Sequence, residues 1–240
     1  MTPLNRRTVS PLLFLFVLAI SATFARGSQE PRTREAPRDR TTPTLQRMTP
    51  TQREHAKLFR GITATRTKML DEKVSTVVIG EFASPTPPLS TTEFITNLMC
   101  SSDDVFIGVV TSVEAFPTED GTFLFSEYAL QPLEAFGGRT DAVRPGERVT
   151  LVRPGGTTMV EGTKISATIN GYPPLELGGQ YLLFASRLNT NALTTTTEGI
   201  FRVSPSEMKS LYHISTKDSP GGPLAVKSGT IRQLLAARDC

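Results

Sequence analysis

Short apolar runs rich in β-branched residues, separated by Gly and Pro turns, dominate the hydrophobic pattern of this chain. The strongest is residues 105–113, where Val and Ile stand at both parities of the run, so both faces of the predicted strand are covered. Gly108, in its middle, permits a bend or the close approach of another backbone. We expect this run to be the first core strand of one β-rich domain.

Further strands follow at a spacing of roughly ten residues, each bounded by turn signals. The turns include Asp120-Gly121, which suits a tight hairpin, and Glu161-Gly162. The predicted strands are residues 73–82, 123–130, 149–153, 157–160, 165–169, 181–185 and 200–203. Pro132 predicts an edge or a bulge at the end of the second core strand. The pattern favours a mainly β domain, either a small barrel or a β-sandwich.

Helices are predicted only around this sheet. Ser90 and Glu93 have the spacing of a capping box, and an apolar stripe from Phe94 to Met99 follows them up to Cys100. Thr51 could cap a short helix over residues 52–59, with Gly61 as its stop. Residues 206–212 and 230–238 predict two helical segments near the end of the chain.

The N-terminus has the pattern of a secretory signal peptide. Arg6 and Arg7 precede an apolar segment over residues 11–20, and the small residue Ala25 marks the expected cleavage site. No later run approaches the roughly 20 apolar residues of a membrane span. We therefore expect an exported protein, secreted or located in the periplasm or cell envelope, with no transmembrane segment after processing.

Composition divides the rest of the chain. Residues 26–69 are rich in Arg, Thr and Pro and offer little to bury, which predicts a disordered basic arm with a short helix near its end. Residues 70–99 form a connecting strand and helix segment, and residues 100–240 form the β-rich domain with its C-terminal helix.

Charge follows the same division. Residues 26–69 hold 11 Lys and Arg against 4 Asp and Glu, whereas residues 70–240 hold 13 against 19. A basic arm of this kind can meet an anionic surface such as a cell-envelope polymer, or it can simply keep an exported protein soluble. Aromatic residues do not interleave with the arginines, so nucleic acid is not an expected partner.

The two cysteines, Cys100 and Cys240, flank the predicted domain. In an exported protein they could form a disulfide that joins its two ends, and closing so long a loop could add about 4–5 kcal/mol. The alternatives are two separate thiols, or an intermolecular bond through Cys240.

The order of these segments resembles exported bacterial proteins of unknown function with a barrel like the OB-type fold of netrin modules and metalloproteinase inhibitors. The resemblance spans about residues 100–203 and is carried by the segments 100–110, 127–138 and 178–184. It implies a small OB-like barrel. The inhibitors bind a protease's zinc through an N-terminal Cys, whereas Cys100 lies inside this chain. The resemblance therefore implies a fold and no activity.

One motif suggests catalysis. Lys217-Asp218-Ser219-Pro220-Gly221-Gly222 is similar to the nucleophile loop of chymotrypsin-like serine proteases. Pro220 is an extra residue after the serine, and Lys217 replaces the glycine that helps to form the oxyanion hole. His55 and His213 lack the setting of a triad histidine. We predict that Asp218 and Ser219 form a turn rather than a nucleophile.

No other pattern indicates a catalytic, metal or cofactor site, and we expect no cofactor. The pairs Asp103-Asp104 and Glu119-Asp120 lack a calcium-binding loop and are interpreted as solvated charges at strand ends. The leading hypothesis is an exported, non-catalytic binding domain for a protein or cell-envelope polymer. The alternatives are a structural envelope-associated protein and, least favoured, a serine hydrolase that uses Ser219.

Overall fold

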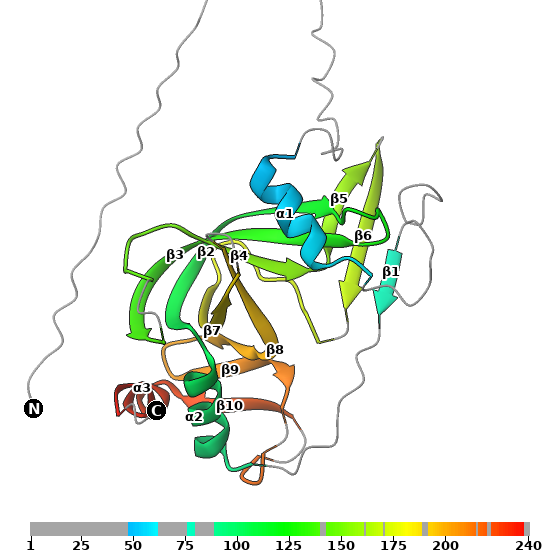
Figure 1. Cartoon of the computed structure of the whole chain (residues 1–240). Coiled ribbons are helices and arrows are strands. Elements are labelled where there is room, and N and C mark those ends of the chain that lie inside the picture. Colours follow the sequence, from blue (N-terminus) through cyan, green and yellow to red (C-terminus); the bar gives the residue numbers. More distant parts are fainter. Residues whose placement is uncertain are drawn as a thin grey trace, which may run out of the picture. The chain divides into compact units, whose positions relative to one another are not determined.

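The computed structural model describes residues 48–61, 76–79, 89–139, 143–160, 162–169, 171–188, 192–214, 216–219 and 222–237. Its elements, in chain order, are α1 (Pro50–Leu58), β1 (Thr76–Ile79), α2 (Thr91–Ser101), β2 (Asp104–Pro117), β3 (Leu124–Gly137), β4 (Val149–Pro154), β5 (Gly156–Val160), β6 (Thr163–Ile169), β7 (Gln180–Arg187), β8 (Ala192–Val203), β9 (Glu207–His213), β10 (Pro223–Lys227) and α3 (Ser228–Ala236). The protein is mainly β, as the apolar runs predict (Figure 1).

Five strands form a ring in the order β2, β3, β4, β8, β7 and back to β2. All neighbours are antiparallel except β4 and β8, which run parallel and are joined by only two residue pairs, Thr150 with Ala192 and Leu151 with Leu193. We call this short junction the seam. The prediction of a barrel is confirmed, and a five-stranded, partly open Greek-key ring is OB-like in architecture.

The long hairpin β2–β3 forms the largest part of the ring. Register shifts near Ile107 and Gly108 place Gly108 opposite Pro132, which is the bulge predicted from that proline. Both strands continue beyond the predicted ends, because the bulge lets β3 keep pairing after Pro132 instead of ending there. Their far ends extend past the ring toward the β5–β6 hairpin.

The barrel interior is filled by apolar side chains from alternating positions. Its buried cluster comprises Phe106, Val110, Tyr128, Leu130, Val143, Leu151, Leu175, Tyr181, Leu183, Ala185, Leu193 and Ile200. Strands β2 and β7 are apolar on both faces because a second cluster covers their outer side.

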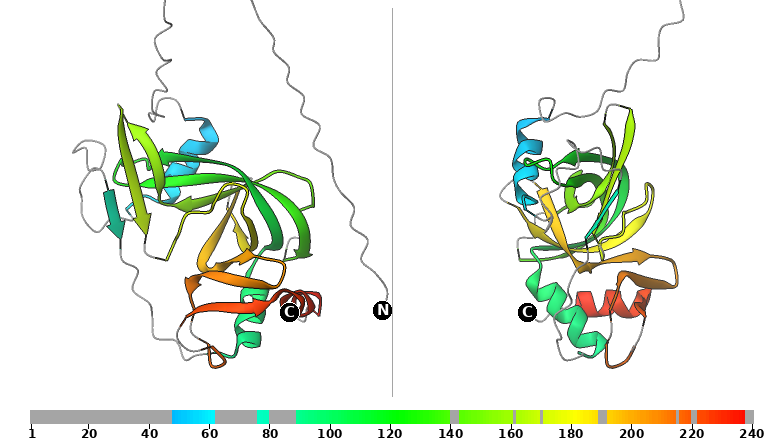
Figure 2. Two further views of the ribbon diagram at one scale, coloured as in Figure 1. Left: turned by 180° about the vertical axis from the view of Figure 1, so that it is seen from behind. Right: turned by 90° about the vertical axis from the view of Figure 1, so that its right-hand side faces the viewer.

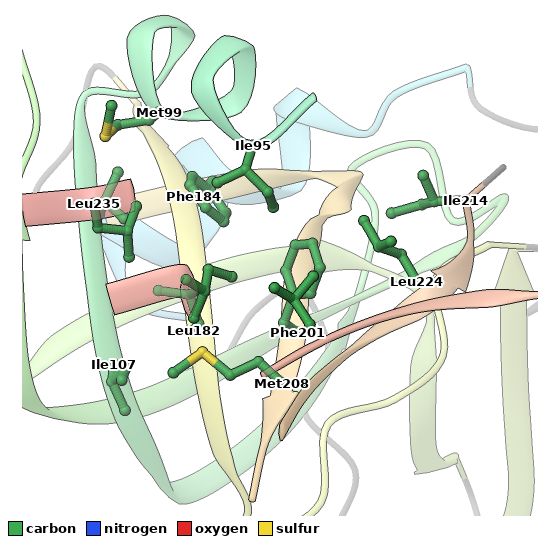
Figure 3. Packing of buried hydrophobic residues seen from close by; sticks show 13 residues of the cluster. Ile95, Met99, Ile107, Leu182, Phe184, Phe201, Met208, Ile214, Leu224 and Leu235 are labelled. Carbon is green, nitrogen blue, oxygen red and sulfur yellow. The ribbon is translucent and has the colours of Figure 1, made fainter. Parts of the chain in front are cut away.

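That outer cluster is built by α2, α3, β9 and β10. Figure 3 shows Ile95 of α2 and Leu235 of α3 facing Leu182 and Phe184 of β7. The rings of Phe184 and Phe201 pack edge to face with centroids 5.9 Å apart. The capping box predicted for α2 is present, with Ser90 as N-cap and Glu93 at N3. We call this side of the barrel the helical side.

The β5–β6 hairpin lies at the end of the molecule opposite α2 and α3 (Figures 1 and 2). It forms the predicted hairpin around Glu161-Gly162, and β1 pairs with β6 in parallel, so these strands make a separate three-stranded sheet. The connecting strand expected in residues 73–82 is thus confirmed in its central part.

The prediction of a helix at residues 206–212 is wrong, because this segment is strand β9. Met208 and Ser210 are buried while Glu207 and Lys209 are exposed, which is the two-residue alternation of a half-buried strand. Strand β10 then pairs with β9. The final helix is confirmed as α3.

The helix predicted near residue 52 exists as α1, but Thr49 rather than Thr51 caps it, with Pro50 in the first turn. Met48 and Ala56 are buried against Phe125, Val152 and Ala192 of the barrel. Residues 48–61 are therefore part of the packed structure, where the sequence predicts an arm. Within the described residues, no helix has the length and apolar character needed to cross a membrane.

Candidate functional site

A hollow of about 210 Å³ lies where the β5–β6 hairpin meets the end of the barrel. Strand β2 contributes Val113 and Ala115 to its wall, β3 contributes Ser126 and Tyr128, and the segment after β6 contributes Tyr172 and Leu175. The hairpin itself forms the remaining wall. We call this hollow the hairpin pocket.

Two consecutive glycines, Gly155 and Gly156, shape the base of the hairpin pocket. Both have positive φ, and a Cβ on Gly156 would lie 2.2 Å from Ser126 Oγ and 2.8 Å from Ala115 Cβ. Ser126 Oγ instead donates a hydrogen bond to the Gly155 carbonyl at 2.8 Å. The glycines let the chain leave β4 and return as β5 while lying against β3, so no side chain fills the pocket from below.

Arg153 lies behind this pocket, directly opposite Ser126 in the β3–β4 register. Its side chain is only 2 % exposed. Its Nη1 donates to the Pro173 carbonyl at 2.8 Å, and its guanidinium carbon lies 5.3 Å from the centroid of the Tyr172 ring. Its buried Nε has no hydrogen-bond partner in the described structure. Burial lowers the pKa of Arg153, and the nearby tyrosines oppose this shift.

Residues 171–179 hold the guanidinium in place. Leu175 is buried in the barrel cluster, and the Glu176 backbone N–H donates to the Tyr181 hydroxyl at 2.9 Å. The Glu176 carboxylate forms two bonds of 2.9 and 2.7 Å with Arg202. Tyr172, which lines the hairpin pocket, thus lies between the pocket and the guanidinium of Arg153.

His55 belongs to α1, which packs on the opposite side of β3, and is only 1 % exposed. Its Nδ1 is 2.6 Å from Glu127 Oε1, and Gln52 of the same helix reaches the other carboxylate oxygen at 3.5 Å. The helix also contacts the β2–β3 turn, where Asp120 accepts the Gly61 N–H at 3.1 Å. The histidine and the carboxylate therefore attach α1 to the barrel.

Asp218 and Ser219 belong to a loop that holds the start of α2. Asp218 Oδ2 accepts the backbone N–H of Thr91 at 2.8 Å, and the Ser219 N–H donates to Thr216 Oγ1 at 3.1 Å. Pro220 and Gly221 lie outside the described residues. His55 is buried on the face of α1 that contacts Glu127, and His213 is exposed on β9.

The remaining predicted sites are only partly described. Cys100 lies on α2 and packs beside the outer apolar cluster. Cys240 and Ala25 lie outside the described residues, so the disulfide and the cleavage site stay predictions. Helix α2 contacts α3, which ends at Ala236, shortly before Cys240.

Three residues of the two acidic pairs are not the solvated charges that the sequence suggests, whereas Glu119 is exposed as expected. Asp104 is buried and lies 2.9 Å from Arg187 Nε, and Asp103 accepts the Arg187 backbone N–H at 2.8 Å. This backbone bond holds the pKa of Asp103 below its ordinary value, with help from Arg139. Asp120 accepts bonds from Thr118 and Thr122 in the β2–β3 turn. Among the described residues, no group of three or more potential ligands is placed to hold a metal ion.

Sequence reasoning missed Arg153 because an arginine at the end of a strand ordinarily faces solvent. The only signal was the adjacent Pro154-Gly155-Gly156, which marks a close approach of backbones as well as a turn. No family model matches the chain, and no curated protein matches it either.

Proposed function

We propose that this protein is an exported, non-catalytic binding domain whose ligand occupies the hairpin pocket. The observation that carries the proposal is an open hollow of about 210 Å³ backed by a buried guanidinium. Binding sites are typically concave, mostly apolar and furnished with a few polar groups. The hairpin pocket has this composition, and rigid strands on two sides form it in advance.

The polar clusters elsewhere support a non-catalytic role. A general base must reach the proton that it removes, at about 2.6–3.2 Å. His55 of α1 is buried against Glu127 of β3, and Asp218 binds the first turn of α2. Both side chains therefore hold secondary-structure elements together, although acid–base chemistry would need them to face a substrate.

Export is part of the proposal and is supported by the signal-peptide pattern around Ala25. The intact mass of the secreted product should be that of a chain that begins at residue 26. The alternative of a structural envelope protein depends on the basic arm, residues 26–69, of which only residues 48–61 are described.

A fragment screen by ligand-observed NMR tests the binding proposal. Val113→Trp places a large ring at the exposed rim of the hairpin pocket and should abolish the signals of fragments that bind there. Leu133→Trp is the matched control, because Leu133 is equally exposed, at 46 % against 45 % for Val113, and does not line the pocket. If every fragment bound both variants as it binds the parent chain, the hairpin pocket would not be the site.

The hydrolase alternative has its own test. A serine-reactive fluorophosphonate should not label the purified chain, because Pro220 cannot supply an oxyanion-hole N–H and restricts Ser219 to extended conformations. Stoichiometric labelling that Ser219→Ala abolishes would replace the binding proposal with a serine hydrolase.

A further inference from the structure

The described arginines differ in burial and in whether a carboxylate balances their charge. Four of those with described ion pairs at the barrel and its flanking helices are at least partly exposed and bind a carboxylate: Arg139 with Asp103, Arg187 with Asp104, Arg202 with Glu176 and Arg232 with Glu134. Arg153 is far more deeply buried and has no carboxylate partner among the described residues. Among the described arginines, the most deeply buried guanidinium thus has no carboxylate to balance its charge.

Burying a cation without an anion is costly, since the ion loses its hydration and recovers only part of that free energy after the surroundings relax. The Pro173 carbonyl and the Tyr172 ring offset part of this cost. They leave the Nε donor unpaired. Packing alone would be served better by an apolar residue of similar length, so the charge at position 153 calls for a partner from outside the chain.

The geometry points to a small organic anion as the ligand of the hairpin pocket, with its carboxylate on Arg153 and an apolar body against the pocket wall. This inference rests on the proposed binding function. A planar guanidinium matches a carboxylate in shape and donates charge-assisted bonds to it. Val113, Ala115, Tyr128 and Leu175 supply the apolar wall.

The size of the hairpin pocket narrows the class of ligand. A dry cavity of roughly 150 Å³ can hold a benzene molecule. A hollow of about 210 Å³ therefore has room for one ring with a carboxylate. Inorganic phosphate would reach the charge without using the apolar wall. A one-ring aromatic acid uses both.

A ligand in the hairpin pocket is separated from the charge of Arg153 by the ring of Tyr172. Arg153 is not among the residues that line the hairpin pocket, whereas Tyr172 lines it and lies over the guanidinium. The carboxylate therefore reaches Arg153 when this ring turns aside. Binding should change the ring signals of Tyr172 in an NMR spectrum of the tyrosine-labelled chain and leave those of Tyr212, outside the pocket, unchanged.

A matched pair of probes tests the inference on the full chain. Benzoate and benzamide have nearly the same shape, but only benzoate carries a negative charge. We expect saturable benzoate binding that is at least about tenfold tighter than benzamide binding, and a similar loss of benzoate affinity in Arg153→Met. Arg148→Met is the control, since it removes the same charge from the exposed start of the β4 region and should bind benzoate normally. Phosphate should compete only weakly.

The outcomes separate the inference from the proposed function. Equal affinity for both probes, no benzoate binding, or unchanged benzoate binding by Arg153→Met would overturn the anion inference. If neutral fragments still lost binding in Val113→Trp, the hairpin pocket would remain a binding site. Should Arg153→Met fail to fold, Arg153→Lys and Val113→Trp supply the test: the lysine variant should weaken benzoate binding and the tryptophan variant should abolish it.

Discussion

The barrel is covered in two different ways at its two ends. On the helical side, α2, α3, β9 and β10 bury a continuous apolar cluster that includes Ile95, Phe201 and Leu235. At the other end, the β5–β6 hairpin rests on paired glycines and leaves a hollow, and the segment after it covers the charged side chain of Arg153. The first arrangement maximises contact and stability. The second sacrifices contact, which is expected of a site that must accept another molecule.

The largest expected effect tests the helical side. Phe201→Ala should lower the free energy of unfolding by about 3–5 kcal/mol, because it removes a fully buried ring that packs against Phe184. Denaturant titration followed by circular dichroism measures this loss. Met159→Ala, at an exposed position of β5, should change it by less than about 0.5 kcal/mol. Equal losses would show that stability is spread evenly over both ends.

The second prediction concerns the proposed disulfide between Cys100 and Cys240. If it joins the contacting helices α2 and α3, Cys100→Ser should lower the free energy of unfolding by about 2–4 kcal/mol. A reducing agent should lower the free energy of unfolding of the parent chain by the same amount. Thiol titration of the unfolded, unreduced parent should detect no free thiol. Two titratable thiols would show that the helical side relies on packing alone.

The third prediction contrasts the hairpin end with the helical side. In Arg153→Met the lost hydrogen bond to Pro173 and the lost contact with Tyr172 should be offset by the avoided cost of burying a charge. The free energy of unfolding should then change by no more than about 1 kcal/mol. A loss as large as that of Phe201→Ala would mark Arg153 as a structural residue and remove the contrast between the two ends.

The smallest effect is one of pH. The pKa of Asp103 is lowered in the folded protein, first by the Arg187 backbone N–H and then by Arg139. Its contribution to stability is therefore present above its ordinary pKa of 3.8 and is lost as the pH falls through the lowered value. Thermal unfolding between neutral pH and the acid range should show this decline, and Asp103→Asn should make it shallower. An identical pH profile for both chains would contradict this prediction.

Local patterns predicted most of the fold. Residues 105–110 and 181–185 became neighbouring strands β2 and β7 because both segments carry apolar residues on both faces, and Ser90 with Glu93 capped α2 as expected. Residues 206–212 misled because Met208 and Leu211 have a helical spacing, whereas pairing with β8 and β10 imposes an extended chain.

The site could not be predicted in the same way, because its parts meet only through long-range pairing. Arg153 comes to face Ser126 through the β3–β4 register, and residues 171–176 then cover it. His55 stands in a polar stretch, and its burial depends on Glu127, which is 72 residues away. Neither relation leaves a trace in the local hydrophobic pattern.

The seam between β4 and β8 has a practical consequence for where the protein can be cut. Only two residue pairs join these strands, but Val152 and Ala192 on either side of the seam both pack against α1. Helix α1 thus bridges the two strands of the ring that share the fewest residue pairs. A recombinant fragment that began at residue 70 would lack α1. It would expose Phe125 and Val152 to water and let the ring open at the seam. Clones intended for crystallisation should therefore start upstream of Met48.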